Sequence, residues 1–361
     1  MWEDEEVIDV LKIIAPGTRF REGLENVLKA RTGGLIVVGD SKEVLDIVDG
    51  GFEVNQDYSP AHLYELAKMD GAIVISKDLK KILYANAQLA PERNIPTVET
   101  GTRHRTAERV AKQTGELVIS ISQRRNVITL FKGNQRYVLP DTSVVLTRAN
   151  QALQTLEKYK ASLDGVMNNL NALEFEDMVT LENVCTAIQR IEMVLKIASE
   201  LERYIYELGD ESRLVEMQLQ ELIGGTKYDL ELILKDYIKD NSKDVEETKN
   251  NIKELTYTEL TDSNYLSKIL GYSSSIQSDM LLKTRGYRVL SMIPRMPGFI
   301  TEKLVLQFGD LQGIMNASIS ELDDVDGIGE IRAKNISDGL KRMREQTLFD
   351  IRFWQNLNFV L

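Results

Sequence analysis

Apolar positions change their spacing several times along residues 1–145, which indicates interleaved helices and strands. Apolar side chains three or four residues apart predict helices over 5–14 and 20–28, and Pro60 at a first turn predicts a third. Short apolar or alternating runs predict strands at 35–38, 73–75, 81–85, 117–121, 127–130 and 136–139. Because the two kinds of element alternate, we expect an α/β domain with a mixed sheet flanked by helices.

Residues 146–287 follow a different pattern. Apolar residues recur every three or four positions over 153–170, over 181–208, and over a third stripe that begins with Leu214 and Met217. This spacing is typical of long amphipathic helices that pack on one another. Cys185 stands at an apolar helical position, where a small buried side chain is expected. We therefore predict an all-α spacer between the two ends of the chain.

Residues 288–361 contain a short turn between two helical runs. Gly327, Ile328 and Gly329 resemble the turn of a helix-hairpin-helix motif, whose backbone N–H groups can bind a DNA phosphate. Arg332 and Lys334 on the following helix would supply local positive charge. The alternative is a turn that only joins two helices. We expect a third, DNA-binding domain here.

An earlier stretch around Pro297-Gly298 could be the paired hairpin of a tandem, RuvA-like domain, although it lacks the Gly-x-Gly pattern. Contacts of this kind reach the DNA backbone and not the bases. They predict binding with little sequence preference and with a preference for DNA shape, such as branched structures. From residue 288 onward there are nine Lys and Arg against ten Asp and Glu, so one motif alone should bind weakly.

Composition narrows the classes of protein further. Hydrophobic residues make up 43% of the 361 positions, but no apolar run approaches the roughly 20 residues that a membrane helix needs. Cys185 is the only cysteine and there are two histidines, which excludes a disulfide framework, a Cys-rich zinc site and a multi-histidine site. The net charge of −12 excludes bulk electrostatic binding of nucleic acid. An acidic start without a secretory n-region, together with the lone thiol, predicts a cytoplasmic protein.

The first candidate for chemistry is the segment 100–108. Arg103, His104 and Arg105 place three potential cations side by side, with hydroxyls at Thr102 and Thr106, just before a predicted helix. Free N–H groups at a helix start favour an anion, and arginine forks match phosphate oxygens two at a time. The segment therefore indicates a triphosphate-binding loop, with an exposed basic turn as the alternative.

The second candidate is Asp70, which with Gly71 and Ala72 leads into the strand at 73–75. A carboxylate at a strand entrance can hold Mg²⁺, which bridges phosphate oxygens and keeps several waters. Gly71 would let a ligand approach the backbone. An ordinary Asp-Gly turn is the alternative. Paired with the cationic segment, the carboxylate supplies what phosphoryl or nucleotidyl transfer requires.

Asp70-Gly71-Ala72 and the string Gly-Thr-Arg-His-Arg-Thr-Ala-Glu-Arg over 101–109 together resemble the paired signature of diadenylate cyclase domains. The resemblance to one group of these proteins, the DisA family, extends through the whole chain. It implies synthesis of cyclic di-AMP from two ATP with release of two pyrophosphates, by cyclase domains that face each other across protomers. It also implies Mg²⁺ or Mn²⁺, a homo-octamer, a helical linker, and lowered synthesis when branched DNA binds.

Carried over residue by residue, the resemblance makes Asp70 the metal ligand and a catalytic residue together with Arg103, His104 and Arg105. It assigns the nucleotide to a larger set of residues, with Leu89 on the adenine: Gly71, Ala72, Leu89, Thr102, Arg103, His104, Arg105, Thr106 and Ser122. Two other functions stay open from the residues alone. One is a DNA-binding scaffold whose nucleotide site only senses ATP, and the other is a nucleotidyltransferase with a different acceptor.

Overall fold

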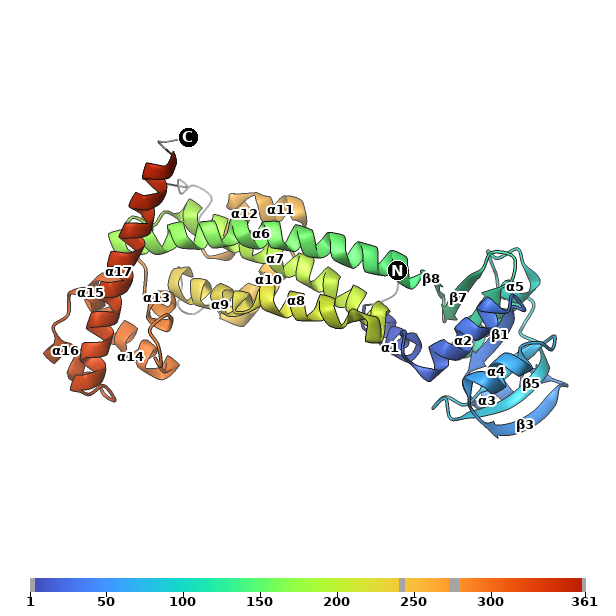
Figure 1. Cartoon of the computed structure of the whole chain (residues 1–361). Helices are drawn as coiled ribbons and strands as arrows, with labels where there is room; N and C mark the ends of the chain where they lie inside the picture. Colours follow the sequence, from blue (N-terminus) through green and yellow to red (C-terminus); the bar gives the residue numbers. More distant parts are fainter. Residues whose placement is uncertain (1–3, 240–243, 273–278, 359–361) are drawn as a thin grey trace. The chain divides into compact units, whose positions relative to one another are not determined.

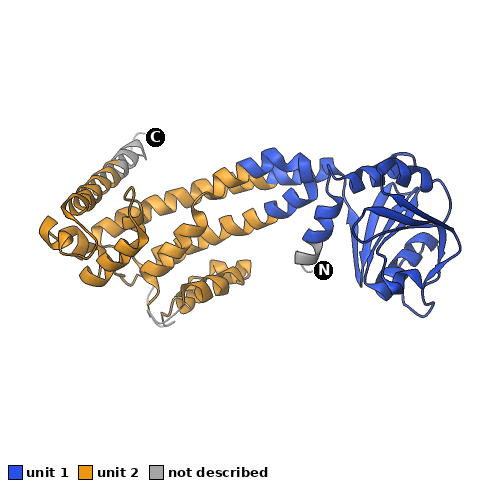
Figure 2. Ribbon diagram, turned by 90° about the horizontal axis from the view of Figure 1, so that it is seen from below, with its two compact units in different colours: residues 1–151, 201–217 blue, residues 152–200, 218–361 orange. Residues whose placement is uncertain are grey.

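The computed structural model describes residues 4–239, 244–272 and 279–358 (Figure 1). The chain forms two compact units (Figure 2). One consists of residues 1–151 and 201–217, and the other of residues 152–200 and 218–361. No helix among the described residues has both the length and the apolar character needed to cross a bilayer.

A mixed sheet forms the centre of the first unit, as predicted. Its strands run in the order β2-β5-β4-β1-β6-β7-β8, with β3 paired to β5. β1 and β4 are parallel, and the other pairs are antiparallel. The strands are β1 (Gly34–Val38), β2 (Val48–Asp49), β3 (Phe52–Asp57), β4 (Ala72–Ile75), β5 (Lys81–Leu89), β6 (Leu117–Ser122), β7 (Val127–Lys132) and β8 (Gln135–Leu139).

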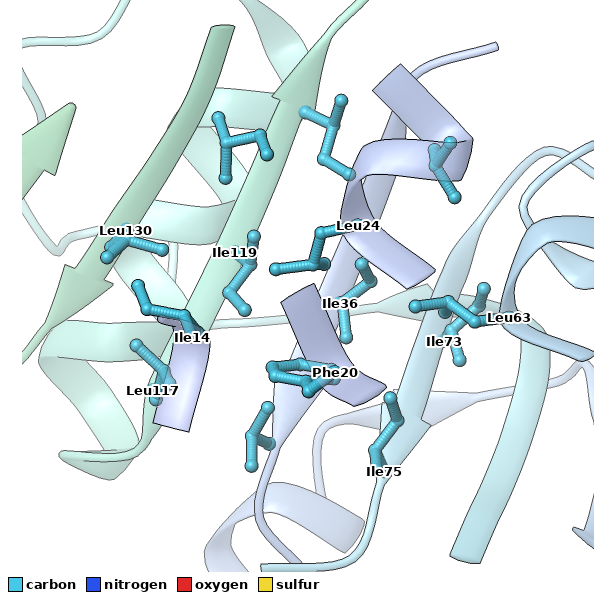
Figure 3. Packing of buried hydrophobic residues seen from close by; sticks show 14 of the residues in the cluster. Ile14, Phe20, Leu24, Ile36, Leu63, Ile73, Ile75, Leu117, Ile119 and Leu130 are labelled. Atoms are coloured by element: carbon cyan, nitrogen blue, oxygen red, sulfur yellow. The ribbon is translucent and has the colours of Figure 1, made fainter. Parts of the chain in front are cut away.

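One face of this sheet packs on α1 (Asp4–Ile14), α2 (Arg19–Lys29) and α4 (Pro60–Leu66). Figure 3 shows Ile36 and Ile119 of the sheet against Phe20 and Leu24 of α2. α2 begins where the sequence dictates, because the Thr18 hydroxyl accepts the N–H of Arg21 at 3.1 Å. The start of α4 is fixed in the same way by Ser59, with Pro60 at the first turn.

The other face packs on α3 (Lys42–Leu45) and α5 (Thr102–Thr114). Side chains alternate along a strand, so Val37 and Val74 point to this face while their neighbours point to the first. Val110 of α5 is fully buried against them. Both faces of the central strands are therefore covered, which explains their uninterrupted apolar runs.

Several elements differ from the sequence-based prediction. β3 was not predicted, because five of its six residues are exposed and no alternation results. β5 continues to Leu89 and does not end at Ala85, since Ala87 and Leu89 pair with β4 and β2. α5 begins at Thr102, earlier than expected.

The helical segment confirms the prediction of long amphipathic helices. Its elements are α6 (Thr142–Glu176), α7 (Leu181–Leu208), the 3₁₀ turn η1 (Gly209–Ser212), α8 (Arg213–Ile223), α9 (Thr226–Tyr237), α10 (Val245–Lys253), α11 (Tyr257–Thr261) and α12 (Ser263–Ile269). Cys185 is buried as predicted, and burial raises its pKa to about 11. The third stripe is confirmed in its later part, where Leu230 and Ile233 are buried, but it was wrong at Leu214 and Met217, whose side chains are 72% and 58% exposed. α8 buries Val215 and Leu219 instead.

A buried polar cluster joins the last part of the second unit to its linker helices. The Arg288 guanidinium forms an ion pair with Glu174 of α6, and both side chains are almost completely buried. The Glu174 carboxylate also accepts the Tyr237 hydroxyl at 2.8 Å. Asp236 accepts backbone N–H groups of Gly286 and Arg288, which caps the start of the next helix. No pattern in the sequence indicated this cluster.

The final segment consists of short helices followed by one long one. They are α13 (Tyr287–Ser291), α14 (Gly298–Phe308), α15 (Leu311–Asn316), α16 (Ile319–Asp323) and α17 (Glu330–Asn358). The turns before α14 and α17 have the same backbone hydrogen bond, from Met296 to Ile293 in one and from Ile328 to Val325 in the other. They also share a left-handed residue at the same place, Arg295 in the first and Gly327 in the second.

Candidate nucleotide-binding site

Strand pairing brings Asp70 and Ser122 to one edge of the sheet, beside the start of β1. β1 and β4 are parallel and Ile36 faces Ile73, so the residues just before both strands, Gly33 and Asp70, lie at the same edge. β6 is antiparallel to β1, with Ile121 facing Gly34, and therefore ends there at Ser122. Neighbouring strands are about 4.8 Å apart. Asp70 and Ser122 thus flank the start of β1 from its two sides.

Arg103 reaches this edge from the first turn of α5. A β-carbon built on Gly33 would lie 2.4 Å from the Arg103 Nη1 atom, so the guanidinium rests directly against the residue that precedes β1. Arg103 is half-buried and has no hydrogen-bond or ion-pair partner among the described residues. A half-buried cation without a partner next to the Asp70 turn is what an anionic ligand would complete.

The cationic residues lie inside the helix and not in a loop before it, which corrects the prediction for this segment. α5 starts at Thr102, and the N–H of Arg105 already donates to the Gly101 carbonyl at 2.9 Å. Gly101 caps the helix without a side-chain hydrogen bond. The first-turn N–H groups of Thr102, Arg103 and His104 therefore point out of the helix start, as an anion site requires.

His104 is held in an apolar setting. Its ring meets the Phe131 ring edge-on, with centroids 6.4 Å apart. Burial lowers its pKa below the ordinary histidine value, with Arg125 and Arg136 lowering it further and Glu99 opposing them. The Nε2 atom is buried and has no hydrogen-bond partner among the described residues. A neutral imidazole can donate one ring N–H, which suits binding of a phosphate oxygen.

Asp70 is the carboxylate of this edge. It is exposed, sits in the bend before β4, and is not hydrogen-bonded to any described residue. The described residues contain no group of three or more acidic, His or Cys side chains that could form a closed metal site. A single hard oxygen ligand fits Mg²⁺ or Mn²⁺ held jointly by the protein, water and ligand phosphates. The site thus has the chemistry for a metal that arrives with a nucleotide.

Gly71 has a structural reason to be glycine. Its φ is +99°, and a β-carbon there would come within 2.8 Å of the Asn86 carbonyl carbon of β5. The close approach of backbones keeps the Asp70 turn next to the end of β5. Leu89, which lies beyond the predicted strand at 81–85, is the last residue of β5 and is 8% exposed. Ala72 is buried at the start of β4, so any ligand contact it makes is through its backbone.

The remaining predicted residues also lie on α5 and at the end of β6. Thr102 is exposed and Thr106 is partly exposed, one turn further along the helix. Arg105 donates from Nη2 to the Thr100 carbonyl at 3.3 Å, so it is partly committed to the preceding loop. Ser122 is half-buried, and its hydroxyl accepts the N–H of Arg125 at 3.2 Å.

The residues predicted to contact DNA differ in how far their side chains are accessible to a ligand. The Ile328 side chain is buried, so only its backbone is available to a ligand. Arg332 folds back onto its own turn, with Nη1 donating to the Gly327 carbonyl at 2.6 Å. Gly329 and Lys334 are exposed. The turn therefore offers backbone groups and one lysine.

Comparisons with known proteins identify the family. The family model described as DisA bacterial checkpoint controller nucleotide-binding matches residues 21–136, and the DisA linker-region model matches residues 139–279. The chain is 57% identical to the DNA integrity scanning protein DisA of Acetivibrio thermocellus, over 97% of this chain and 98% of that protein. It is 58% identical to the DisA protein of Clostridium botulinum strain Loch Maree, over 96% and 98%. The chain belongs to the DisA family.

Both candidate segments of this DisA-family chain fall inside the matched nucleotide-binding range. Among solved structures, similarity was found to DacA from Staphylococcus aureus, in a double cysteine mutant. That match has 19% identity and a TM-score of 0.30, and it covers 39% of this chain and 91% of that one. A hypothetical membrane spanning protein from Bacillus cereus matches with 18% identity and a TM-score of 0.31, over 34% and 62%.

Sequence reasoning missed the side chains that hold the loop before α5. Glu108 is 7% exposed and accepts the Thr97 hydroxyl at 2.5 Å and the Val98 N–H at 3.2 Å. Arg109 donates to the Ile95 carbonyl at 3.0 Å. We call residues 90–101 the strap, because side chains of α5 form hydrogen bonds with several of these residues. Glu108 and Arg109 belong to the family string, but nothing in the sequence showed that they face back onto this loop.

Proposed function

We propose that this chain is a diadenylate cyclase that condenses two ATP into cyclic di-AMP and two pyrophosphates. The observation that carries the proposal is that Asp70 and the Arg103 guanidinium lie at the same edge of the sheet, each without a hydrogen-bond or ion-pair partner among the described residues. A carboxylate for a metal and a cation for phosphates are the parts that nucleotidyl transfer needs. Membership of the DisA family supports the same reaction.

The reaction balances over two nucleotides. The 3′-oxygen of each ATP forms a bond to the α-phosphorus of the other, and each α–β phosphoanhydride bond breaks. Two pyrophosphates leave, and each hydroxyl loses a proton. Because the phosphates carry the developing charge, positioning and electrostatic stabilisation account for most of the catalysis.

Each side chain has a defined part in this proposal. Asp70 would hold the divalent metal, which when bound withdraws charge from the phosphates and acidifies the 3′-hydroxyl. Arg103 and Arg105 would hold phosphate oxygens through paired N–H groups. His104, kept neutral by burial, would donate one N–H to a phosphate oxygen.

Smaller groups would complete the nucleotide site. The Thr102 and Thr106 hydroxyls, in the first turns of α5, would contact phosphate oxygens. Gly71 and Ala72 would contact the nucleotide through their backbone, and Ser122 through its hydroxyl. Leu89 would pack on the adenine from the end of β5.

One such site holds one ATP, so attack requires a second site that faces it. We propose that two cyclase domains from different protomers meet in this way, within a homo-octamer. Asp70 is the one carboxylate that this proposal assigns to the metal, so the metal would bind together with the nucleotide phosphates. ATP and DNA are both present in the cytoplasm, where we place the protein.

We also propose that the paired turns of the final segment bind DNA as a helix-hairpin-helix domain without sequence preference. Their matching backbone hydrogen bonds and left-handed residues support a tandem arrangement. Several copies in one assembly would offset the weak binding of each, because linked sites gain effective concentration. Branched DNA would lower synthesis by favouring an arrangement in which facing sites are misaligned, which requires different DNA affinities for two states.

The test is analysis of nucleotide products after purified protein is incubated with ATP and Mg²⁺ or Mn²⁺, with and without a four-way DNA junction. The proposal predicts cyclic di-AMP, and less of it with the junction. ATP that stays bound and unchanged would instead support an ATP-sensing scaffold. A different adenylylated product would support a nucleotidyltransferase with another acceptor.

A further inference from the structure

Gly33 lies at the start of β1, in a position to which no role has been assigned so far. It is buried, and its φ of +72° is in the left-handed region. A β-carbon built on it would lie 2.4 Å from Arg103 Nη1 and 3.4 Å from Arg103 Cζ. It would also lie 3.1 Å from the Ile121 carbonyl oxygen of β6. The Arg103 guanidinium therefore occupies the space that any side chain at position 33 would need.

The two obstacles differ in how easily they move. The Ile121 carbonyl belongs to a strand that is paired on both sides, with β1 and with β7, so it is fixed. The guanidinium is the end of a flexible side chain without a hydrogen-bond or ion-pair partner in the described part of the chain. A methyl group at position 33 would therefore displace Arg103 first, while its close contact with the Ile121 carbonyl, at 3.1 Å, would remain.

We propose that Gly33 is a positioning residue for the cyclase reaction. Its missing side chain lets the Arg103 guanidinium lie over the start of β1, between the ends of β4 and β6. This inference rests on the proposed function only in taking Arg103 as a phosphate ligand. Gly33 touches no reacting atom and acts through Arg103.

A glycine with positive φ can be required for its backbone alone, and the chain contains a control for that role. Gly115 ends the same helix α5 with the same φ of +72°, and a β-carbon there would meet nothing within 4 Å. Gly115→Ala therefore introduces the backbone strain without the collision. The difference between Gly33→Ala and Gly115→Ala therefore reports the two collisions at position 33, with Arg103 and with the Ile121 carbonyl, and a Gly33→Ala/Arg103→Ala double variant separates the part that acts through Arg103.

The experiment uses the full-length protein and 3′-deoxy-ATP with Mg²⁺, a probe that carries the triphosphate but lacks the attacking hydroxyl. Dissociation constants are measured by calorimetry for wild type, Gly33→Ala, Gly115→Ala, Arg103→Ala and the Gly33→Ala/Arg103→Ala double variant. Loss of a charged hydrogen bond corresponds to about tenfold or more in affinity. We expect a loss of this size for Gly33→Ala, and wild-type affinity for Gly115→Ala.

The double variant separates a role through Arg103 from a general structural role. We expect Gly33→Ala to add no further loss of affinity when Arg103 is already alanine, because the two changes remove one interaction. We also expect the double variant to melt higher than Gly33→Ala, since the collision with Arg103 is gone and only the close contact with the Ile121 carbonyl remains. The comparison of the double variant with Arg103→Ala remains a test even if Gly33→Ala alone does not fold.

Three outcomes would overturn the inference. They are wild-type affinity in Gly33→Ala, an equal loss in Gly115→Ala, or a double variant that binds more weakly than Arg103→Ala or does not fold. A wild type that binds 3′-deoxy-ATP but makes no cyclic dinucleotide from ATP would reject the proposed function. The binding measurements would still decide the role of Gly33.

Discussion

Thr97 donates its hydroxyl to the Glu108 carboxylate at 2.5 Å and so ties the strap to the helix that carries the cationic residues. Burial alone would raise the pKa of Glu108, but hydrogen bonds from Lys112 and Thr97 hold it below the ordinary value. The carboxylate is therefore charged at neutral pH. Because the strap runs from the end of β5 to the start of α5, this bond fixes the distance between the proposed adenine and phosphate contacts.

Glu108→Ala should lower kcat/KM for ATP by about tenfold, mainly through a higher KM, because the strap loses two hydrogen bonds. Glu108→Gln keeps an acceptor for the Thr97 hydroxyl, so its kcat/KM for ATP should lie closer to that of wild type. Steady-state kinetics of both variants check this. A Glu108→Ala enzyme with unchanged kcat/KM would show that the strap does not position the site.

Asp70→Asn should lower synthesis of cyclic di-AMP by roughly a hundredfold or more with either Mg²⁺ or Mn²⁺, because the metal loses the carboxylate that we propose binds it. Its melting temperature should stay near that of wild type, since Asp70 is exposed and has no partner among the described residues. Removal of the metal with EDTA should likewise stop synthesis and leave melting unchanged.

The matched control is Asp40→Asn. Asp40 is also exposed but follows the other end of β1, so the same change of charge occurs away from the site. Wild-type synthesis is expected for this variant. Equal losses in the two variants would mean that position 70 has no special role.

The pattern of apolar residues predicted most of the central sheet, because strands buried on both faces are short uninterrupted apolar runs. It missed β3, whose exposed residues do not alternate in polarity. It also placed Arg103 in a loop, since helical periodicity becomes visible only from Ala107 onward, where apolar residues begin to recur.

The strand pairing that brings the residues of the site together could not be predicted from the sequence. The parallel pairing of β1 with β4 brings Gly33 and Asp70 to one edge, and such pairing depends on the whole fold. Gly33 looked like an ordinary residue before a strand. Arg288 and Glu174 lie more than one hundred residues apart in the chain, and a single charged residue on a helix usually indicates a solvent-exposed face.

Arg288→Met should destabilise the second unit by about 3 to 5 kcal/mol, because the buried Glu174 carboxylate loses its counter-ion. Urea unfolding followed by circular dichroism measures the loss. Adding Glu174→Gln should recover part of it, since the unpaired charge is then removed. No destabilisation in the single variant would contradict the burial of the pair.

Gly329→Leu should weaken binding of a four-way junction by roughly tenfold, because a bulky side chain would keep DNA phosphates from the backbone of the turn. A β-carbon at Gly329 meets nothing within 4 Å, so the fold should tolerate the change. Gly298→Leu makes the same change beside the first turn, where space is also free, and reports whether that turn contacts DNA. Unchanged junction affinity in both variants would contradict a DNA-binding role for the paired turns.

The central claim is that Asp70 and Arg103 form one ATP site whose facing partner completes the reaction. The most direct measurement is chromatography with mass analysis of the products that wild type and Asp70→Asn make from ATP and Mg²⁺ or Mn²⁺. Our account predicts that cyclic di-AMP and pyrophosphate accumulate together, at one cyclic dinucleotide per two pyrophosphates, with wild type only. Unchanged ATP with wild type, or equal synthesis by the two proteins, would contradict it.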